Sequence, residues 1–489
     1  MNIILVVNNP KHWPLHIPGV NVTSARAYLT DPAYSEDKSA KVFNLCRSYS
    51  YQSSGYYVSL LAAARGHKPI PDISTIQDLK SPYVIRAQSE ELESLIENKL
   101  KRLQSKHFTL SIYFGRNMAK HYDSLSQRLF SVFQVPLLRA EFVKRKTWQL
   151  DSISTITTSE IPASHRSFVI EAAIDYFSKK KRRIRRRVPA RFDIAVLHNP
   201  NEAEPPSNEK ALMKFQKAAE TIGLDLELIT RNDLARLAEF DALFIRETTA
   251  VNHYTFRFSQ RAKAEGLVVI DDPDSILKCT NKVYLAELMA RHNVPIPKTM
   301  IVHRNNVGDI GNNLGFPCVL KQPDSAFSMG VMKAENEEEL KEMTARLLEK
   351  SELIIAQKFL PTSFDWRVGI CDRRPLYVCR YHMARRHWQV IKRDEQGRSS
   401  SEGNSETLTV GEAPDEVVKT AVRASNLIGD GLYGVDIKQV GNKCFVIEVN
   451  DNPNIDAGIE DVILKDVLYR EIMGVFLKRI EAAKLSPAN

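Results

Sequence analysis

The chain has 489 residues, of which 43% are hydrophobic, so its length and composition suit about three globular domains. The longest nearly apolar stretch, Tyr57 to Ala64, is far shorter than the ~18 residues of a membrane span, and Ile3 to Val7 lacks the features of a signal peptide. The six cysteines are widely spread without a C-x-x-C pair, which argues against a disulfide framework or a zinc cluster. We expect a cytoplasmic protein with reduced, mostly buried thiols and no membrane attachment.

The net charge of +9 arises almost entirely from one run, Lys179 to Arg187, which carries eight positive charges. Pro189 follows this run, and we interpret residues 179–190 as a solvated basic linker between domains. The alternative is an arm that contacts RNA, the ribosome or another acidic partner.

Residues 1–178, before the linker, are predicted to form an N-terminal α/β domain. Strands are expected at Ile3 to Val7 and Lys41 to Cys46, and a helix at Gly55 to Ala64. The strand, loop and helix start at residues 41–64 could hold an anion beside a tyrosine-lined pocket, whose members would be Tyr49, Tyr51, Tyr56 and Tyr57. We interpret these tyrosines as packing residues of the core instead, and the role of the domain is not inferred from the sequence.

The alternation of strands and helices starts again after the linker. Strands are predicted at Phe192 to Leu197, Leu224 to Ile229, Ala242 to Ile245 and Leu267 to Ile270, and helices at Asn208 to Ala219 and Asp233 to Leu237. This order favours a small parallel sheet covered by helices.

Two apolar strands near the C-terminus are predicted to form a hairpin through a three-residue loop, Gly441 to Lys443. That loop places Asp436 opposite Glu448, and strand alternation puts Asn450 on the same face. Facing carboxylates on buried strands need a positive partner, and Mg²⁺ prefers oxygen ligands. We therefore predict a metal site, with an exposed acidic pair as the alternative.

Two further strands could serve a nucleotide. Lys321 ends the apolar strand Pro317 to Lys321 before a loop of small residues, where a lysine suits phosphate oxygens. The apolar strand Leu353 to Leu360 has a backbone edge that could hydrogen-bond a flat heterocycle. Either strand could instead be an ordinary part of a core.

Together and in this order, these elements resemble the ATP-grasp superfamily over about residues 191–484, most closely its RimK-like branch. Further matches are Asn281-Lys282 at the start of a helix and the run Glu448 to Pro453. The resemblance implies an α/β and α+β multidomain fold, with an ATP-grasp domain at residues 277–484 behind a small parallel α/β domain at residues 191–276. Residues 1–178 look like the N-terminal domain of one subset of the family.

The same resemblance implies a set of site residues. For ATP these are Lys282 and Lys321 at the phosphates, Gln357, Lys358, Phe359 and Leu360 at adenine, Asp365 at the ribose and Asn404 at the nucleotide or metal. For Mg²⁺, with Mn²⁺ as an alternative, they are Asp436, Glu448 and Asn450, and Arg380 is the catalytic arginine beside the transferred phosphoryl group. The lid loop departs from the family because Ser325 to Met329 lacks glycine, and Lys358 stands where glutamate is common.

The activity implied is an ATP-dependent carboxylate-amine ligase that forms an acylphosphate and releases ADP, with glutamate or a similar amino acid as one substrate. The other substrate would be a small carboxylate, or a peptide or protein C terminus, and a homo-oligomer is expected. A basic cluster either binds substrate carboxylates or is a solvated strand pair: Arg380, His382, Arg385, Arg386, His387 and Lys392. The alternatives are a nucleotide-binding regulator that contacts RNA, the ribosome or an acidic protein, and a ligase that uses a thiol or hydroxyl nucleophile.

Overall fold

The computed structural model describes residues 3–13, 17, 20–36, 40–178, 190–324, 330–384, 388–393 and 399–485. They fall into two compact units: unit 1 is Met1–Arg191 with Asn232–Glu239, and unit 2 is Phe192–Arg231 with Phe240–Asn489. The predicted basic run, the lid loop at residues 325–329 and three members of the basic cluster, residues 385–387, lie outside the described residues. The domain boundaries expected from the sequence stay predictions.

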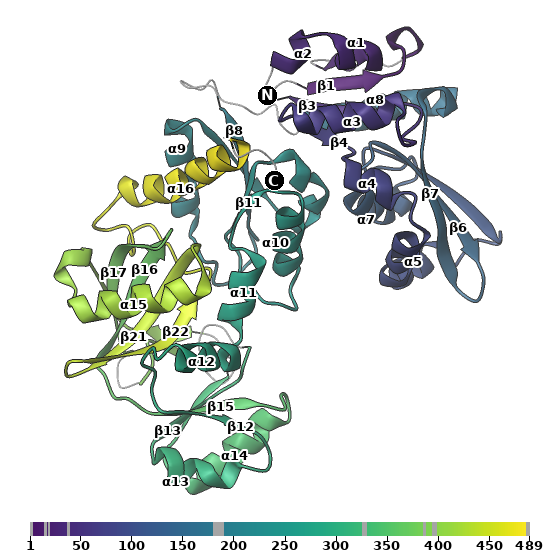
Figure 1. The fold of residues 1–489 in the computed structure, drawn as a ribbon. Helices are drawn as coiled ribbons and strands as arrows, with labels where there is room; N and C mark the ends of the chain where they lie inside the picture. Colours follow the sequence, from purple (N-terminus) through teal and green to yellow (C-terminus); the bar gives the residue numbers. More distant parts are fainter. Residues whose placement is uncertain are drawn as a thin grey trace. The chain divides into compact units, whose positions relative to one another are not determined.

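Unit 1 begins with a parallel sheet in the order β2-β1-β3-β4 (Figure 1). Its strands are β1 (Ile3–Val7), β2 (Asn21–Ser24), β3 (Lys41–Asn44) and β4 (Lys68–Ile70), with helices α1 (Ala25–Thr30), α2 (Ala33–Glu36) and α3 (Ser54–Ala64). The predicted helix is confirmed as α3, and it begins where the Ser53 hydroxyl accepts a hydrogen bond from the Tyr56 amide.

Unit 1 also contains an antiparallel sheet, β5-β6-β7, that the sequence did not predict. Its elements are α4 (Ile73–Asp78), α5 (Pro82–Glu91), α6 (Glu93–Leu100), β5 (His107–Tyr113), α7 (Asp123–Phe133), β6 (Leu137–Lys144), β7 (Trp148–Thr155) and α8 (Arg166–Ser178). Helices α5, α6 and α7 share a core with the antiparallel sheet, whereas α8 packs against β1 and β3 of the parallel sheet.

Unit 2 opens with the second parallel sheet, in the order β11-β10-β8-β9. Its elements are β8 (Phe192–Leu197), α9 (Glu209–Thr221), β9 (Leu224–Ile229), β10 (Ala242–Ile245), α10 (Tyr254–Ala264), β11 (Val268–Ile270) and α11 (Pro273–Thr280). These confirm the predicted strands. The short helix expected near Asp233 is a 3-10 helix, Arg231–Glu239, which belongs to unit 1 except for its first residue.

Two antiparallel sheets complete unit 2. The first, β12-β15-β13-β14, comprises β12 (Thr299–Val302), β13 (Cys318–Lys321), β14 (Val331–Ala334) and β15 (Ile354–Lys358), with helices α12 (Lys282–Arg291), α13 (Ile310–Leu314) and α14 (Glu337–Leu348). The second, β20-β17-β16-β21-β22, comprises β16 (Phe364–Cys371), β17 (Arg374–His382), β20 (Ser405–Leu408), β21 (Leu432–Val440) and β22 (Lys443–Asn450), with α15 (Asp415–Ile428). A small pair, β18 (Ile391–Arg393) and β19 (Ser399–Glu402), lies between β17 and β20 in the chain, and α16 (Asp466–Leu485) ends the described residues. This arrangement confirms the predicted multidomain α/β and α+β class.

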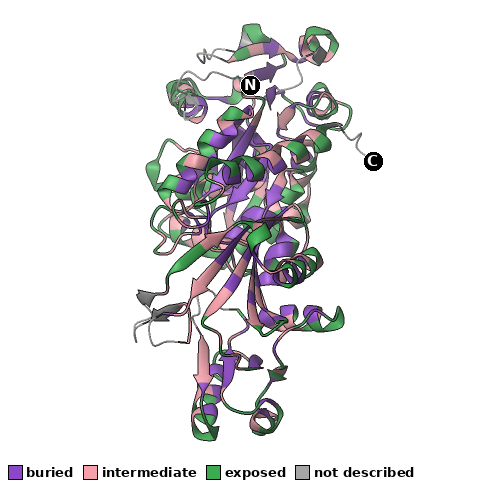
Figure 2. Cartoon of the chain, turned by 90° about the vertical axis from the view of Figure 1, so that its left-hand side faces the viewer, coloured by how far each residue is buried: buried purple, intermediate pink, exposed green. Residues whose placement is uncertain are grey.

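Apolar strand faces and the inner faces of the helices form the cores, and the outer helix faces are exposed (Figure 2). All six cysteines are free and buried, as the sequence indicated. In the part of the chain that the structure describes, no helix is both long enough and apolar enough to cross a membrane.

Candidate active site

The β21–β22 hairpin brings two carboxylates and an amide to one face of its sheet. Asp436 pairs with Glu448 across the strands, and Asn450 pairs with Gly434 two positions along. Since alternate residues of a strand share a face, all three polar side chains project to the same side. The predicted pairing of Asp436 with Glu448, with Asn450 on the same face, is confirmed.

The loop that produces this register differs from the prediction. Val440 pairs with Lys443, so the turn has two residues rather than three, and Gly441 adopts a φ of 61° there. A β-bulge between the paired positions places Ile447 without a partner on β22. The bulge adds the residue that the shorter loop lacks, and the carboxylates therefore still face each other.

Glu448 is held by a lysine at the start of α12. The Nζ atom of Lys282 lies 2.8 Å from Oε1 of Glu448, and the Lys282 side chain is 9% exposed. Burial disfavours the charged form of Glu448, but Lys282, Lys321 and Arg367 together lower its pKa. Glu448 is therefore an anion in a strongly cationic surrounding.

Asp436 has its own cation. Arg367, on the neighbouring strand β16, donates from Nε and Nη2 to the two carboxylate oxygens over 2.6 and 2.7 Å. Burial opposes the charge on Arg367, but the Asp436 carboxylate raises the pKa of the guanidinium well above its usual value. Asn450 Nδ2 also donates to Asp436 over 3.2 Å. Asp436 is thus fixed by a bidentate pair.

The donor set on this face suits a hard divalent cation. Within the described ranges, no three or more Asp, Glu, His or Cys side chains are grouped as a metal site of their own. Asp436 and Glu448 instead supply two carboxylates and Asn450 one amide oxygen, and Mg²⁺ commonly takes one or two carboxylates together with substrate phosphates. These residues suit a divalent cation whose remaining coordination positions are filled by the phosphates of a nucleotide.

Asp365, the predicted ribose-binding acid, lies on the same face of the sheet. Its Oδ1 accepts hydrogen bonds from Lys438 Nζ over 2.5 Å and from Thr362 Oγ1 over 3.1 Å. Burial raises the pKa of Asp365, and the Lys438 ammonium limits that rise. The ribose role stays a prediction.

The structure separates Arg380 from these groups. Arg380 pairs across the sheet with Trp366, one position before Arg367, and so projects to the opposite face. Its guanidinium lies 4.8 Å from the Trp366 ring centroid, and its Nη1 is 3.1 Å from Oε2 of Glu406. The structure therefore does not bring Arg380 together with the hairpin carboxylates, and the arginine that pairs with Asp436 is Arg367.

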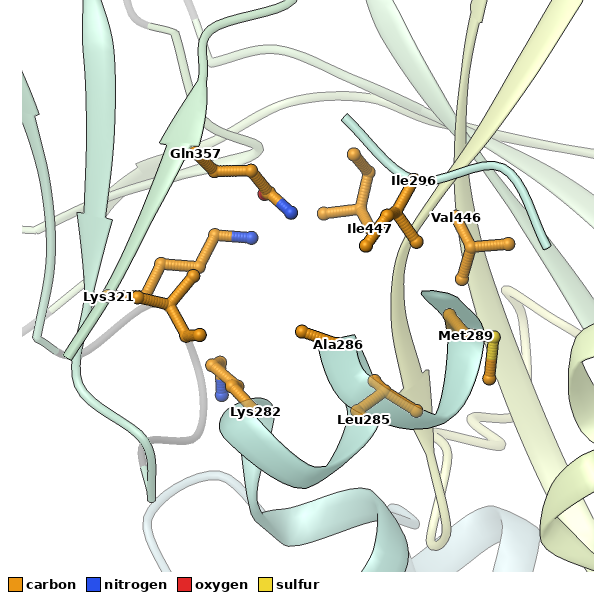
Figure 3. Close-up of a pocket in the computed structure, with 10 residues that line it drawn as sticks. Lys282, Leu285, Ala286, Met289, Ile296, Lys321, Gln357, Val446 and Ile447 are labelled. Carbon is orange, nitrogen blue, oxygen red and sulfur yellow. The ribbon is translucent and has the colours of Figure 1, made fainter. Parts of the chain in front are cut away.

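A pocket opens between α12, the β13–β15 strands and the bulge of β22 (Figure 3). The side-chain nitrogens of Lys321 and Gln357 point into it from the first antiparallel sheet, and Ile447 and Ile296 face them. Burial lowers the pKa of Lys321 to about 8, with Lys282 and Lys438 acting in the same direction against Glu448. The pocket thus joins an apolar wall to a buried ammonium group.

The predicted exposed edge of the strand around Gln357 is wrong. Strand β15 is paired on both sides, with β12 and β13, so its backbone groups are used within the sheet. The next backbone donors are also engaged, because the Lys358 amide donates to Lys298 over 2.8 Å and the Phe359 amide to Pro317 over 3.4 Å. Leu360 lies just beyond the strand, and the adenine role of residues 357–360 stays a prediction.

Asn404 is exposed in the connection before β20, where its carbonyl oxygen accepts a hydrogen bond from the His382 amide. No contact among the described residues joins its side chain to the hairpin carboxylates. Its predicted contact to nucleotide or metal therefore has no geometric support among the described residues.

Sequence reasoning missed two buried carboxyl groups, Asp451 at the end of the hairpin and Glu247 after β10. Asp451 accepts a hydrogen bond from Thr249 over 2.8 Å, and burial raises its pKa to about 7. Burial, with the nearby Glu202 carboxylate, raises the pKa of Glu247 to about 7 as well, and that side chain follows β10. Such carboxyl groups can exchange a proton near neutral pH. The signal available in the sequence was the position of Glu247 and Asp451 directly after buried strands.

Both parts of the chain match known families. Residues 25–172 match the RimK-like ATP-grasp N-terminal domain, and residues 279–467 match the RimK-like ATP-grasp domain. Together with the paired carboxylates and the lysine-lined pocket, these matches define the class: the chain belongs to the RimK-like ATP-grasp proteins and is an ADP-forming ligase.

The individual relatives are distant. A probable alpha-L-glutamate ligase of Marinomonas sp. (strain MWYL1) is 26% identical over 239 residues, which are 48% of this chain and 76% of that protein. The alpha-aminoadipate–LysW ligase LysX of Saccharolobus solfataricus is 25% identical over 198 residues, 38% of this chain and 67% of that protein. Among solved structures, a RimK domain ATP-grasp protein from Sphaerobacter thermophilus aligns with 58% of this chain and 99% of its own, at 15% identity and a TM-score of 0.43.

Proposed function

We propose that this ligase joins a carboxylate to the amino group of glutamate or a similar amino acid. The observation that carries the proposal is the hairpin face on which Asp436 and Glu448 are each paired with a cation, beside a pocket that contains Lys321. The names of the two curated relatives, a glutamate ligase and an aminoadipate ligase, support amide formation with an acidic amino acid.

In the proposed reaction, an oxygen of the substrate carboxylate attacks the γ-phosphorus of ATP, and the bond to ADP breaks. The amine nitrogen then attacks the acyl carbon of the acylphosphate, phosphate leaves, and the nitrogen loses a proton. The protein must hold two anions together and neutralise charge as the phosphoryl group moves. In this proposal Lys282, Lys321 and Arg367 supply the positive charge, and Arg367 takes the part first assigned to Arg380.

Asp436, Glu448 and Asn450 would hold Mg²⁺, or Mn²⁺ in its place. The ion supplies charge neutralisation at the phosphates when it is bound. Asp365 would bind the ribose, and residues 357–360 would contact adenine beside Ile447.

The proposal is tested by the dependence of ADP formation on both substrates. Full-length protein, ATP and Mg²⁺ are incubated with a panel of carboxylates and with amine, thiol or hydroxyl nucleophiles. L-Glutamate is the first amine to be tested. We expect equal amounts of ADP and amide product, and hydroxylamine should trap the acylphosphate as a hydroxamate. ADP formation that does not depend on the carboxylate would contradict amide ligation, and so would a thioester or ester product.

Glu448→Gln and Asp436→Asn should each reduce this turnover by about 10²–10³-fold, because they remove charge from the proposed metal face. Asp415→Asn, on an exposed first turn of α15, is the matched control and should retain wild-type turnover. Wild-type activity in either hairpin variant would overturn the proposed metal site.

A further inference from the structure

We propose that residues 3–178 are a second, shortened copy of the ligase fold of unit 2, and that this copy no longer binds ATP. The chain would then hold one nucleotide site although it contains two versions of the fold. The inference rests on the nucleotide site proposed above for unit 2. Its support comes from a comparison of the two units, element by element.

The two parallel sheets have the same topology. In each, the strand order is second, first, third and fourth along the chain: β2-β1-β3-β4 in unit 1 and β9-β8-β10-β11 in unit 2. The registers agree as well, because Phe43 pairs with Ile70 and Phe244 pairs with Ile270 between the third and fourth strands. The shared strand order allows the two sheets to be aligned strand by strand, with Phe43 matched to Phe244 and Ile70 to Ile270.

The helices between these strands share their detailed contacts. Helices α3 and α10 each carry a serine, Ser59 and Ser259, whose hydroxyl donates over 2.7 Å to the carbonyl of the residue that follows the fourth strand. The next residue in each unit, Asp72 or Asp272, caps the following helix through its side chain. The paired positions lie 200 residues apart in the sequence.

The same spacing continues into the next helix. Helix α5 begins after Ser81 and α12 begins after Asn281, and each capping side chain accepts a hydrogen bond from the amide three residues on. The first residue of α12 is Lys282, the partner of Glu448, and proline occupies the equivalent position in α5. The capping geometry is retained, but the phosphate-site lysine is lost.

The C-terminal parts of the two units also correspond. The order helix, strand, strand, helix is α7-β6-β7-α8 in unit 1 and α15-β21-β22-α16 in unit 2, and the hairpin lies next to β5 or β16. Both hairpins carry a β-bulge on the second strand, at Asp151 in β7 and at Ile447 in β22. A shared bulge fixes the alignment of these strands without reference to sequence identity.

In each unit the last helix returns to the parallel sheet. The ring of Phe177 in α8 lies 4.9 Å from Phe43, and the ring of Phe476 in α16 lies 5.3 Å from Phe244. Phe43 and Phe244 are the equivalent residues identified by strand register. The two folds are therefore closed by the same aromatic contact.

The alignment at the bulge shows what the copy has lost. Next to the bulge, Glu141 pairs with Ser152 in unit 1, and Asp436 pairs with Glu448 in unit 2, so Glu141 corresponds to Asp436 and Ser152 to Glu448. The Ser152 hydroxyl donates a hydrogen bond to Glu141 over 3.0 Å. Arg367, which pairs with Asp436, is matched by Thr109, which pairs with Glu141. Thr109 and Glu141 are exposed, so this face lacks the buried cation and carboxylate pairs of unit 2.

The nucleotide-binding sheet has no counterpart in unit 1. In unit 2, residues 292–363 between α12 and β16 contain β12 to β15, including Lys321 and Gln357. In unit 1, the shorter stretch of residues 92–106, which the structure describes completely, contains α6 and no strand. Without that sheet there is no wall to oppose the hairpin, and a nucleotide cannot be enclosed there.

The test is the number of nucleotide sites per full-length chain. We expect a titration with a non-hydrolysable ATP analogue and Mg²⁺ to give one site. The double variant Lys321→Ala with Glu448→Gln should weaken that binding by at least about 100-fold, with no second site remaining. A second site in the wild-type chain, or a site of wild-type affinity in the double variant, would overturn the inference.

Matched substitutions at equivalent positions give an independent readout. Glu141→Gln and Ser152→Ala should leave analogue affinity and ADP formation within about twofold of wild type, unlike Asp436→Asn and Glu448→Gln. Thermal unfolding of each variant controls for loss of fold. A tenfold loss of analogue affinity in a folded Glu141→Gln variant would contradict a silent copy. Failure of the proposed ligation chemistry is distinguishable, since it appears in the wild-type protein as absent amide product while the number of analogue sites is unchanged.

Discussion

At the scale of single residues, Lys321 combines burial with a proposed role, phosphate binding, that requires a positive charge. Burial lowers its pKa to about 8, so the ammonium form predominates below that pH and is lost above it. Phosphate oxygens are bound by the charged form, and the free enzyme should therefore capture ATP less well as pH rises through about 8.

We expect kcat/KM for ATP to fall about tenfold per pH unit above that pKa, measured from initial rates at saturating amino acid and carboxylate. Lys321→Arg keeps its charge over this range because the guanidinium pKa exceeds 12, so the variant should lose the alkaline decline even if its rate is lower. The same decline in Lys321→Arg would assign the titration to another group.

At the scale of elements, the two faces of the second antiparallel sheet separate chemistry from packing. Arg367 and Arg380 lie on adjacent rows of the sheet, one paired with Asp436 and the other stacked on Trp366. Arg367→Lys should lower turnover by about 10²-fold, since a single ammonium cannot form the bidentate contact. Arg380→Lys should retain turnover within about threefold and lower the melting temperature slightly. Paired kinetic and thermal measurements check this, and equal kinetic losses would return Arg380 to the site.

The bulge of β22 has a separate consequence. Deleting Ile447 would allow a regular ladder in which Asp436 still faces Glu448, because the bulge holds one residue that has no partner. The variant should fold and keep the carboxylate pair, but lose an apolar wall of the pocket. We expect the Kd for the ATP analogue to rise about tenfold, with Ile447→Ala changing it in the same direction by less. Unchanged nucleotide binding in the deletion variant would remove Ile447 from the site.

Much of this architecture could be predicted from local patterns in the sequence. Short apolar runs identified β8 to β11 and both strands of the hairpin, and the parity of positions put Asn450 on the face of the carboxylates. Parity could not reveal which strands become neighbours. Strand β15 lies inside its sheet because it pairs with β12 on one side and β13 on the other. Arg380 projects to the face opposite Asp436 because it pairs with Trp366 rather than with Arg367. Such pairings join residues far apart in the chain and leave no periodic signal.

At the scale of the whole molecule, the last helix of unit 2, α16, packs into the core of that unit's parallel sheet. The ring of Phe476 is fully buried with β8 and β10. Phe476→Ala should therefore lower the free energy of unfolding by about 3–5 kcal/mol, measured by denaturant titration. Lys478→Ala, at a site whose side chain is 76% exposed, is the control and should change stability by less than about 0.5 kcal/mol. A small effect of Phe476→Ala would show that α16 is dispensable for this core.

The correspondence between the two units was hidden in the sequence for a physical reason. The residues that match, such as Ser59 with Ser259 and Gly66 with Gly266, set backbone turns and close helix–strand contacts. Most other positions differ because an apolar core accepts many substitutions of similar volume. Topology is therefore retained after sequence similarity has faded.

The pairs Lys282–Glu448 and Arg367–Asp436 give each hairpin carboxylate a cationic partner before any ligand arrives. A free divalent cation would have to displace an ammonium or guanidinium from each carboxylate, so it should bind weakly by itself. A nucleotide brings phosphates that can receive both displaced cations while the carboxylates turn to the metal. In the proposed site, binding would then be an exchange of ionic partners that only the metal–nucleotide complex completes, and the protein should bind free divalent cations poorly between turnovers.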